Sequence, residues 1–435
     1  VDEQSLRFRI REAAVWDDGS FVTADDFVRT WRTMRDEGST LGSAEASIAG
    51  VASIERASLR ELVVRCSAPV PAVLDAFGRG FVVLHPSFDT GDASAENPDL
   101  CGPCDLDGRD ARDETELLLI RKVDWWGDRV PELKGHFAFD RYRFHFVTDQ
   151  ATEVRMLESG QIDLCAVPAA RADRLKEQGL EVASYYLSSY SILGFNATRA
   201  PFDRAEARRA LARLLPRHAM VDADFKGLVR PVDGPFGEGL EAEDASSTIA
   251  RSELAKAGYT DTDGDGRVDR AGAPLEITVL VPAGGIPWLE AVTTRLVDAA
   301  NAAGVALRFE ARPVSALLAA LSAKDFDAFL IIWNARELAP SFRELLHSTE
   351  IRDGGRNFMG YRSDEADRIT DALVRVTDPN QRRALQHELQ ALIVRERPVA
   401  FLFQHASLAA WNPARVAPVF SPRGLSWADL APPAR

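Results

Sequence analysis

The segment from Leu275 to Trp333 constrains the fold most strongly, because apolar strand-like runs and amphipathic helical patterns alternate along it. The expected elements are strand Leu275–Val281, a helix with Leu289, Val292 and Leu296 on one face that closes near Gly304, strand Val305–Phe309, helix Ser315–Leu321 and strand Phe326–Trp333. Alternation of this kind is typical of a parallel sheet covered by helices. We therefore predict an α/β fold.

Shorter patterns elsewhere indicate more than one lobe. The apolar residues of Tyr142–Phe146 alternate as in a strand, Asp149–Glu158 has a helical pattern, and an apolar run follows from Ile162 to Val167. Two strands separated by one helix predict a βαβ unit. Two further helices are expected to begin at Ser363 and at Asp378-Pro379, a capping residue followed by a first-turn proline. A length of 435 residues suits two to four domains of roughly 100–200 residues each.

The composition argues against several classes of protein. The chain carries 52 basic against 66 acidic residues, a net charge of −14, and shows no basic face of the kind that nucleic acid needs. Its longest clean apolar runs, such as Leu117–Ile120 and Phe329–Trp333, fall far short of the roughly 18 residues that span a bilayer. The chain starts at Val1 without an initiator Met, which we interpret as a mature or trimmed product.

The most conspicuous motif is Cys101-Gly102-Pro103-Cys104. Thioredoxin-like oxidoreductases use such a dithiol, in which a helix N-terminus lowers the pKa of the first thiol. Here the motif lies in an Asp-, Gly- and Pro-rich loop instead of a strand–helix junction, and acidic residues follow it. We favour a structural loop, which a local disulfide could close, and keep a thiol–disulfide oxidoreductase as the alternative. The chain's cysteines, Cys66, Cys101, Cys104 and Cys165, allow three full pairings, and the sequence does not choose among them.

A second motif, Asp261-Thr262-Asp263-Gly264-Asp265-Gly266, imitates the start of an EF-hand calcium loop. Asp261, Asp263 and Asp265 stand at ligand positions 1, 3 and 5, but Gly272 stands at position 12, where a bidentate Glu is required. We favour a solvated acidic turn, keep calcium as a candidate ligand there, and expect no other cofactor. The seven histidines are scattered, and no zinc-hydrolase, nucleophile-elbow, P-loop or dinucleotide motif occurs. We therefore predict no catalytic residues and no enzymatic activity.

The end of strand Phe326–Trp333 is a place where position alone suggests function. In an open α/β sheet, ligands bind beyond the carboxyl ends of the strands. The strand ends in Trp333 and Asn334, with Arg336 and Glu337 just beyond, which together offer an aromatic platform, an amide and two charges. These residues could line a ligand site. Equally, Trp333 could cap the core and Arg336 could pair with Glu337 in solvent.

Several segments form an ordered series along the chain. They are FRIREAAVWDDGSFVTADDFVRTW from Phe8 to Trp31, CGPC, RKVDWWG, LESGQIDL, LGFNATRAPFDRAEARRALARLL, ELAKAGYTDTDGDGRVDRAGAPLEITVL, and FDAFLIIW followed by a proline and HS. In this order they resemble the extracellular solute-binding proteins of peptide/nickel-type ABC transporters, solute-binding family 5. CGPC falls where that family has a Gly-x-Gly-Pro element, so the resemblance accounts for this motif without redox chemistry.

The resemblance implies a two-lobed, type II periplasmic-binding-protein-like fold of the three-domain dipeptide/oligopeptide-binding kind, closing over its ligand by hinge motion. It further implies a monomer, located in the periplasm or outside the cell with lipid anchoring as an option, that delivers its ligand to a membrane ABC permease. We expect residues 1–148 to form the family-specific extra domain with part of the first lobe, 149–250 the first lobe, 251–405 the second lobe, and 406–435 a return to the first lobe. The family carries roughly 70–100 further residues before the point that matches Val1, so an N-terminal part is expected to be missing.

The resemblance also reveals a departure at the ligand rim. Peptide-binding members have an Asp three residues after the strand-ending Trp, and its carboxylate pairs with the peptide's α-ammonium; here Arg336 stands at that place. A guanidinium would repel an ammonium and would suit a carboxylate through its bidentate fork. We therefore predict a peptide-like or small organic ligand, anionic ones included, bound at Trp333, Asn334 and Arg336, with Glu337 able to take an amine if the register shifts by one. Tyr190 is a further candidate for stacking on the ligand, although core packing would explain it equally well.

Two alternatives concern the use of this scaffold. A receptor that passes its ligand to a sensor instead of a transporter stays open, because docking surfaces carry no readable signature. A metal or metal-chelate ligand, as in nickel-binding relatives, is not favoured, since no histidine cluster lies at the rim.

Overall fold

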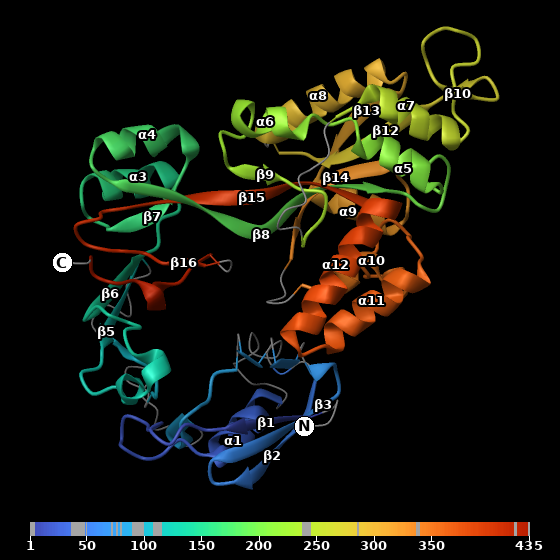
Figure 1. Cartoon of the computed structure of the whole chain (residues 1–435). Coiled ribbons are helices and arrows are strands. Elements are labelled where there is room, and N and C mark those ends of the chain that lie inside the picture. The colour runs from blue at the N-terminus through green and yellow to red at the C-terminus, as the bar shows by residue number, and fades with distance from the viewer. Residues whose placement is uncertain are drawn as a thin grey trace. The chain divides into compact units, whose positions relative to one another are not determined.

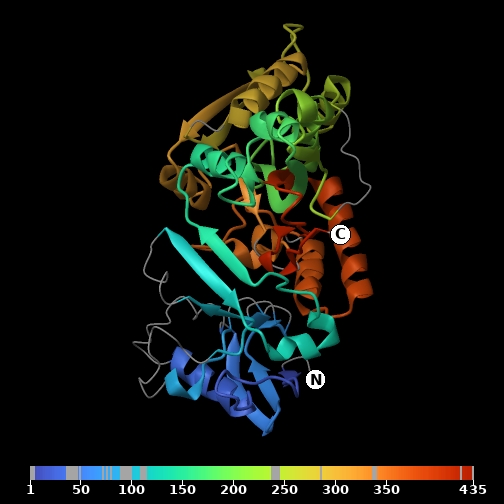
Figure 2. The same cartoon turned by 90° about the vertical axis from the view of Figure 1, so that its left-hand side faces the viewer.

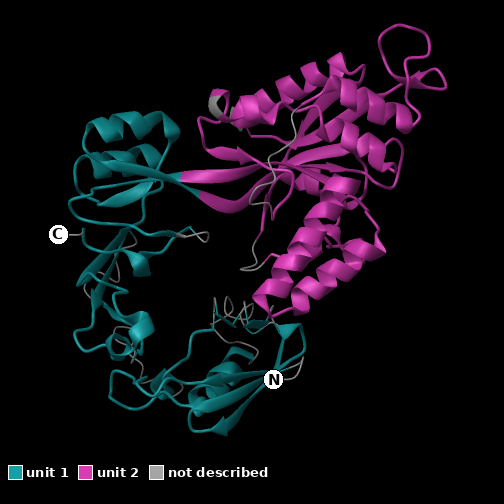
Figure 3. Ribbon diagram, in the orientation of Figure 1, with its two compact units in different colours: residues 1–185, 408–435 teal, residues 186–407 magenta. Residues whose placement is uncertain are grey.

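The computed structural model describes residues 5–35, 48, 50–70, 73–74, 77–78, 81–88, 100–107, 115–236, 245–284, 287–335, 340–421 and 424–433. The chain divides into two compact units, Val1–Tyr185 with Leu408–Arg435 and Tyr186–Ser407, which Figure 3 colours separately. It passes between them inside strand β8 (Glu181–Phe195) and again inside strand β15 (Val399–Trp411). No helix of the described residues has both the length and the apolar character needed to cross a membrane.

The second unit contains the predicted β-α-β-α-β segment (Figure 1). Its elements are β12 (Glu276–Pro282), α8 (Pro287–Ala302), β13 (Ala306–Arg312), α9 (Val314–Ser322) and β14 (Ala328–Asn334). β12 runs parallel to both β13 and β14, and the sheet continues in the order β13-β12-β14-β8-β15, with β9 (Val229–Pro231) also paired to β15. The predicted α/β fold is confirmed, and β8 and β15 add antiparallel strands to it.

Helices cover both faces of this sheet because successive strand residues point to opposite sides. Leu193, Val279 and Leu330 join one apolar cluster, while their neighbours Ile192, Leu280 and Phe329 join another. The first cluster includes side chains of α5 (Ala205–Ala212), α6 (Arg217–Ala223), α7 (Ser247–Lys256) and α8; the second includes side chains of α9, α10 (Arg343–Leu346), α11 (Asp364–Arg375) and α12 (Pro379–Glu396).

The two helices predicted near the C-terminus are confirmed, including their starts. The Ser363 side chain accepts a hydrogen bond from the Ala366 N–H at the start of α11, and the Asp378 side chain accepts one from Gln381 N–H at the start of α12. Each cap satisfies a backbone donor that has no partner within its helix. α11 and α12 pack side by side in both Figure 1 and Figure 2.

The first unit consists of small antiparallel sheets and short helices. Its elements are β1 (Ser5–Arg9), α1 (Ala24–Arg35), β2 (Val51–Ser58), β3 (Glu61–Cys66), β4 (Cys104–Leu106), β5 (Glu116–Arg121), β6 (Arg141–His145), α3 (Gln150–Glu158), β7 (Leu164–Val167), α4 (Ala169–Glu177), β16 (Phe420–Ser421) and β17 (Gly424–Leu425). One sheet has the order β1-β3-β2 with α1 packed against it, and another has the order β4-β5-β6. β7 pairs with the last residues of β15.

The predicted βαβ unit around α3 is wrong. Its two strands, β6 and β7, belong to different sheets: β6 pairs with β5, whereas β7 pairs antiparallel with β15. Periodicity identifies a strand but not its partner, and the partner of β7 comes from the far end of the chain.

The observed units differ in outline from the four expected segments. Residues 186–250, expected in the first lobe, lie in the same compact unit as 251–405. β8 explains this grouping, because it pairs with β14 and brings the chain that follows it onto the same sheet. The finer division into four segments stays a prediction.

Candidate ligand-binding site

Strand β14 places Trp333 and Asn334 at its carboxyl end. In the antiparallel pairing with β8, Trp333 lies opposite Tyr190 and Asn334 lies opposite Ser189. Opposed residues share a face of a sheet, so Trp333 and Tyr190 lie on one face and Asn334 on the other. Trp333 is 8% and Tyr190 6% exposed, whereas Asn334 is exposed.

Tyr190 packs into the apolar core of the second unit. Its ring centre lies 5.5 Å from that of Phe401 and 6.1 Å from that of Phe342, and its hydroxyl donates to the Pro235 carbonyl at 3.3 Å. Burial raises the pKa of the Tyr190 phenol. Of the two roles considered for Tyr190, this geometry fits core packing, and stacking on a ligand stays a prediction.

Trp333 joins the same apolar cluster and also meets a cation of the protein. The Arg356 guanidinium lies 5.7 Å from the centre of the Trp333 ring, and it pairs with Glu344 at 3.1 Å. Arg336 and Glu337 lie outside the described residues, so their predicted roles at the rim stay predictions. Of the rim residues that the structure describes, Asn334 is the accessible one.

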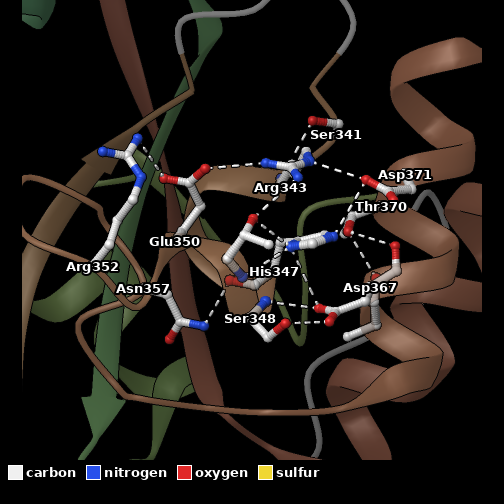
Figure 4. A network of polar contacts seen from close by, with 12 residues as sticks. Ser341, Arg343, His347, Ser348, Glu350, Arg352, Asn357, Asp367, Thr370 and Asp371 are labelled. Carbon is white, nitrogen blue, oxygen red and sulfur yellow. Dashed lines mark hydrogen bonds and ion pairs between the residues drawn. The ribbon is translucent and has the colours of Figure 1, made fainter.

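The segment after the rim is held by a polar network around His347 (Figure 4). His347 Nδ1 accepts a hydrogen bond from the Thr349 N–H at 3.1 Å and lies 2.8 Å from the Thr349 hydroxyl, and His347 Nε2 lies 3.3 Å from Asp371 Oδ1. The Ser348 N–H donates to Asp367 at 2.7 Å. Asp367 and Asp371 belong to α11, so the His-Ser motif joins the end of α10 to that helix. His347 and Ser348 therefore have a structural role, which is to hold the end of α10 against α11.

A second group of polar side chains lies on the sheet face that carries Tyr190. Arg230 of β9 is opposite Gln404 of β15 and donates through Nε to its Oε1 at 2.6 Å. Gln404, 8% exposed, donates in turn to the Leu187 carbonyl at 2.8 Å. The Arg230 guanidinium carbon lies 4.5 Å from the centre of the Tyr186 ring, four residues before Tyr190 on the same strand and therefore on the same face.

This group, which we call the Arg230 cluster, consists of Tyr186, Arg230 and Gln404, and it is not predicted by the sequence. Arg230 and Gln404 are 174 residues apart, and nothing in the local pattern of either segment predicts their pairing. The sequence gives one indication of the group: Tyr186 and Tyr190 are four residues apart, so within one strand their side chains share one face.

The Cys101–Cys104 loop is a structural turn of the first unit. The Cys101 carbonyl accepts hydrogen bonds from the indole N–H groups of Trp125 and Trp126 at 3.2 and 2.7 Å. Cys101 and Cys104 are free cysteines, and burial raises the pKa of both thiols. A redox dithiol needs a thiolate at neutral pH, so this environment opposes the oxidoreductase alternative. A disulfide across the loop is absent as well.

The acidic loop brings three carboxylates together. One oxygen from each of Asp261, Asp263 and Asp265 lies within 4.8 Å of the others. The same carboxylates accept backbone hydrogen bonds inside the loop, and Asp269, at the ninth position, accepts hydrogen bonds from the N–H and the hydroxyl of Thr262. The contacts fit the solvated turn that we favoured, and calcium binding stays a prediction.

The family assignment rests on a match across most of the chain. The sequence profile of Bacterial extracellular solute-binding proteins, family 5 Middle, matches residues 1–351. The chain belongs to this family. The resemblance inferred from the ordered segments is thereby confirmed, and the oxidoreductase alternative finds no support.

Individual relatives of this family 5 protein are distant. Over 282 residues it is 23% identical to the oligopeptide-binding protein AppA of Bacillus subtilis, an alignment that covers 62% of this chain and only 51% of that relative. It is 21% identical over 432 residues to the probable D,D-dipeptide-binding periplasmic protein DdpA of Escherichia coli, covering 97% of this chain and 80% of the other. The crystal structure of a nickel ABC transporter protein from Bacillus halodurans superposes with a TM-score of 0.82 at 21% identity, covering 99% and 88% of the two chains. The type II binding-protein fold is thus confirmed.

Proposed function

We propose that this protein captures a peptide-like or small organic solute outside the cytoplasm and delivers it to a membrane ABC permease. The match of the family profile to residues 1–351 carries this proposal. The division into two compact units, joined through β8 and β15, supports capture by hinge closure. Closure of this kind is a shift of population toward the state in which the ligand makes additional contacts. The protein acts as a monomer in this proposal, in the periplasm or outside the cell, and a lipid anchor would hold it near the permease.

The expected ligand carries a carboxylate. The named relatives bind oligopeptides, D,D-dipeptides or nickel, so membership of the family leaves the ligand open. Arg336 stands where peptide-binding members place an Asp, and a guanidinium suits a carboxylate better than an α-ammonium. We expect binding to tolerate a blocked amino terminus.

A thermal-shift screen of the full chain tests the proposal. The panel contains free tripeptides, N-acetylated peptides, dicarboxylates, opine-like amino-acid conjugates, nickel–histidine and heme. A ligand present at 100 times its Kd stabilises the folded state by about 2.7 kcal/mol, which raises the melting midpoint measurably and in a concentration-dependent way. We expect such a rise with at least one carboxylate-bearing member. If no member of the panel raises the midpoint, solute capture of the proposed kind is contradicted.

A further inference from the structure

We propose that Arg230 anchors the carboxylate of the captured solute, an inference that rests on the proposed solute-binding function. Three independent features of the second unit support it: the way the guanidinium is held, the charges around it, and its place on the sheet.

The guanidinium of Arg230 is held in place by contacts that do not use its two terminal nitrogen atoms. Its Nε donates to Gln404 Oε1 at 2.6 Å, and its plane lies by the Tyr186 ring at 4.5 Å. Gln404 is itself fixed, because its amide nitrogen donates to the Leu187 carbonyl at 2.8 Å. Nη1 and Nη2 make no hydrogen bond within the described parts of the chain. A guanidinium in this state presents a fork that matches the two oxygens of a carboxylate.

The charge of Arg230 also has no counterpart among the described residues. Asp233, only three residues later, pairs with Arg217 at 2.8 Å and with Arg397 at 3.0 Å. Arg230 is half-buried, and among the described residues its guanidinium is hydrogen-bonded to an amide oxygen and lies over an aromatic face, both neutral. An anionic ligand would supply the missing charge, and in a partly desolvated setting such charge-assisted bonds are stronger than neutral ones.

The position of Arg230 connects it to the predicted rim. The strands follow one another in the order β14-β8-β15, with β9 beside β15. One face of the sheet therefore carries Trp333 on β14, Tyr190 and Tyr186 on β8, and Arg230 on β9. Tyr186 is 38% exposed, so it offers an accessible ring next to the cation. Ligand sites commonly combine such aromatic surface with a few fixed polar groups.

Isothermal titration calorimetry on the full chain tests this anchor. The probes are N-acetyl-trialanine with a free carboxyl terminus and its C-terminal amide, together with glutarate and glutaramide. We expect Arg230→Gln to weaken binding of the free acids by about 10- to 100-fold, the range for losing hydrogen bonds to a charged group. The amides should bind the wild type more weakly than the acids and should not respond to the substitution.

Arg270→Gln is the matched control. Arg270 also lies over a tyrosine of the second unit, with its guanidinium carbon 5.9 Å from the Tyr259 ring, but it belongs to the short hairpin of β10 (Asp269–Arg270) and β11 (Ala273–Pro274). Its removal should leave every affinity unchanged. Gln404→Glu provides a second perturbation, because a carboxylate beside Nε would compensate the charge of Arg230 and weaken the free acids by at least 10-fold.

The outcomes separate the anchor from the proposed function. Free acids that bind Arg230→Gln as tightly as the wild type, or amides that bind as tightly as acids, would overturn the anchor while leaving solute capture intact. The proposed role of Arg230 would also be contradicted if only neutral or cationic members of the wider thermal-shift panel bound to the protein. If nothing in either panel bound the wild type, both the anchor and the proposed function would be contradicted.

Discussion

Replacing Asp233 with alanine removes a carboxylate that faces two buried guanidinium groups. Arg217 Nη1 and Arg397 Nη1 lie 2.8 and 3.0 Å from Asp233 Oδ1, and the three side chains are 1%, 3% and 4% exposed. Removing one partner from a buried ion pair costs about 3–5 kcal/mol. Arg217 keeps hydrogen bonds to the Val232 and Phe401 carbonyls at 2.9 and 3.0 Å, so we expect about 3–4 kcal/mol for Asp233→Ala.

Urea denaturation at pH 7, followed by circular dichroism, measures this loss in the free energy of unfolding. The control is Glu344→Ala, which removes the partner of Arg356 in an ion pair of the same unit whose side chains are 56% and 39% exposed. An exposed pair contributes at most about 1 kcal/mol. If Asp233→Ala and Glu344→Ala destabilise the protein equally, the buried charges do not support the second unit as we argue.

Three further predictions concern other buried groups. Burial lowers the pKa of His405 to about 4, so the unfolded chain binds the proton more tightly than the folded protein does. The stability that this histidine contributes above about pH 6.5 is therefore lost as the pH falls toward 4, by about 1.4 kcal/mol per pH unit. His405→Gln should flatten this pH dependence in thermal melts across that range. Gly194→Ala places a Cβ 2.2 Å from Phe329 Cζ and should cost about 1–3 kcal/mol in urea denaturation. Because burial raises the pKa of Cys101 and Cys104, their alkylation by iodoacetamide at pH 7 should be slower than that of free cysteine.

Each of these expectations has a contradicting result. An unchanged slope between pH 6.5 and 4 in His405→Gln would show that another group governs the acid response. Gly102→Ala serves as the control for Gly194→Ala, since an added Cβ there meets nothing within 4 Å; equal effects of the two would refute the steric reasoning. Thiols that react as fast as free cysteine would contradict the buried environment and reopen the redox alternative.

The fold is predictable from the sequence where interactions between residues close in the chain decide the structure. The parallel strands from Glu276 to Asn334 are covered on both faces, so they are recognisable as apolar runs separated by helices. The starts of α11 and α12 were predictable because Ser363 and Asp378 cap their own helices within three residues.

The structure is not predictable from the sequence where interacting strands or side chains lie far apart along the chain. β6 and β7 looked like one βαβ unit, yet β7 takes its partner from β15. Tyr190 was proposed equally for core and ligand, and only the contacts with Phe342 and Phe401 favour the core. The Arg230 cluster depends on the register between β9 and β15, which no local pattern encodes.

Small-angle X-ray scattering of the full chain, with and without a saturating ligand from the thermal-shift panel, shows whether the protein closes over its solute. Capture by hinge closure predicts that the radius of gyration decreases on binding and that the decrease saturates at the concentration where the melting midpoint does. Saturable binding with an unchanged scattering profile would contradict closure, and with it the proposed route from bound solute to permease.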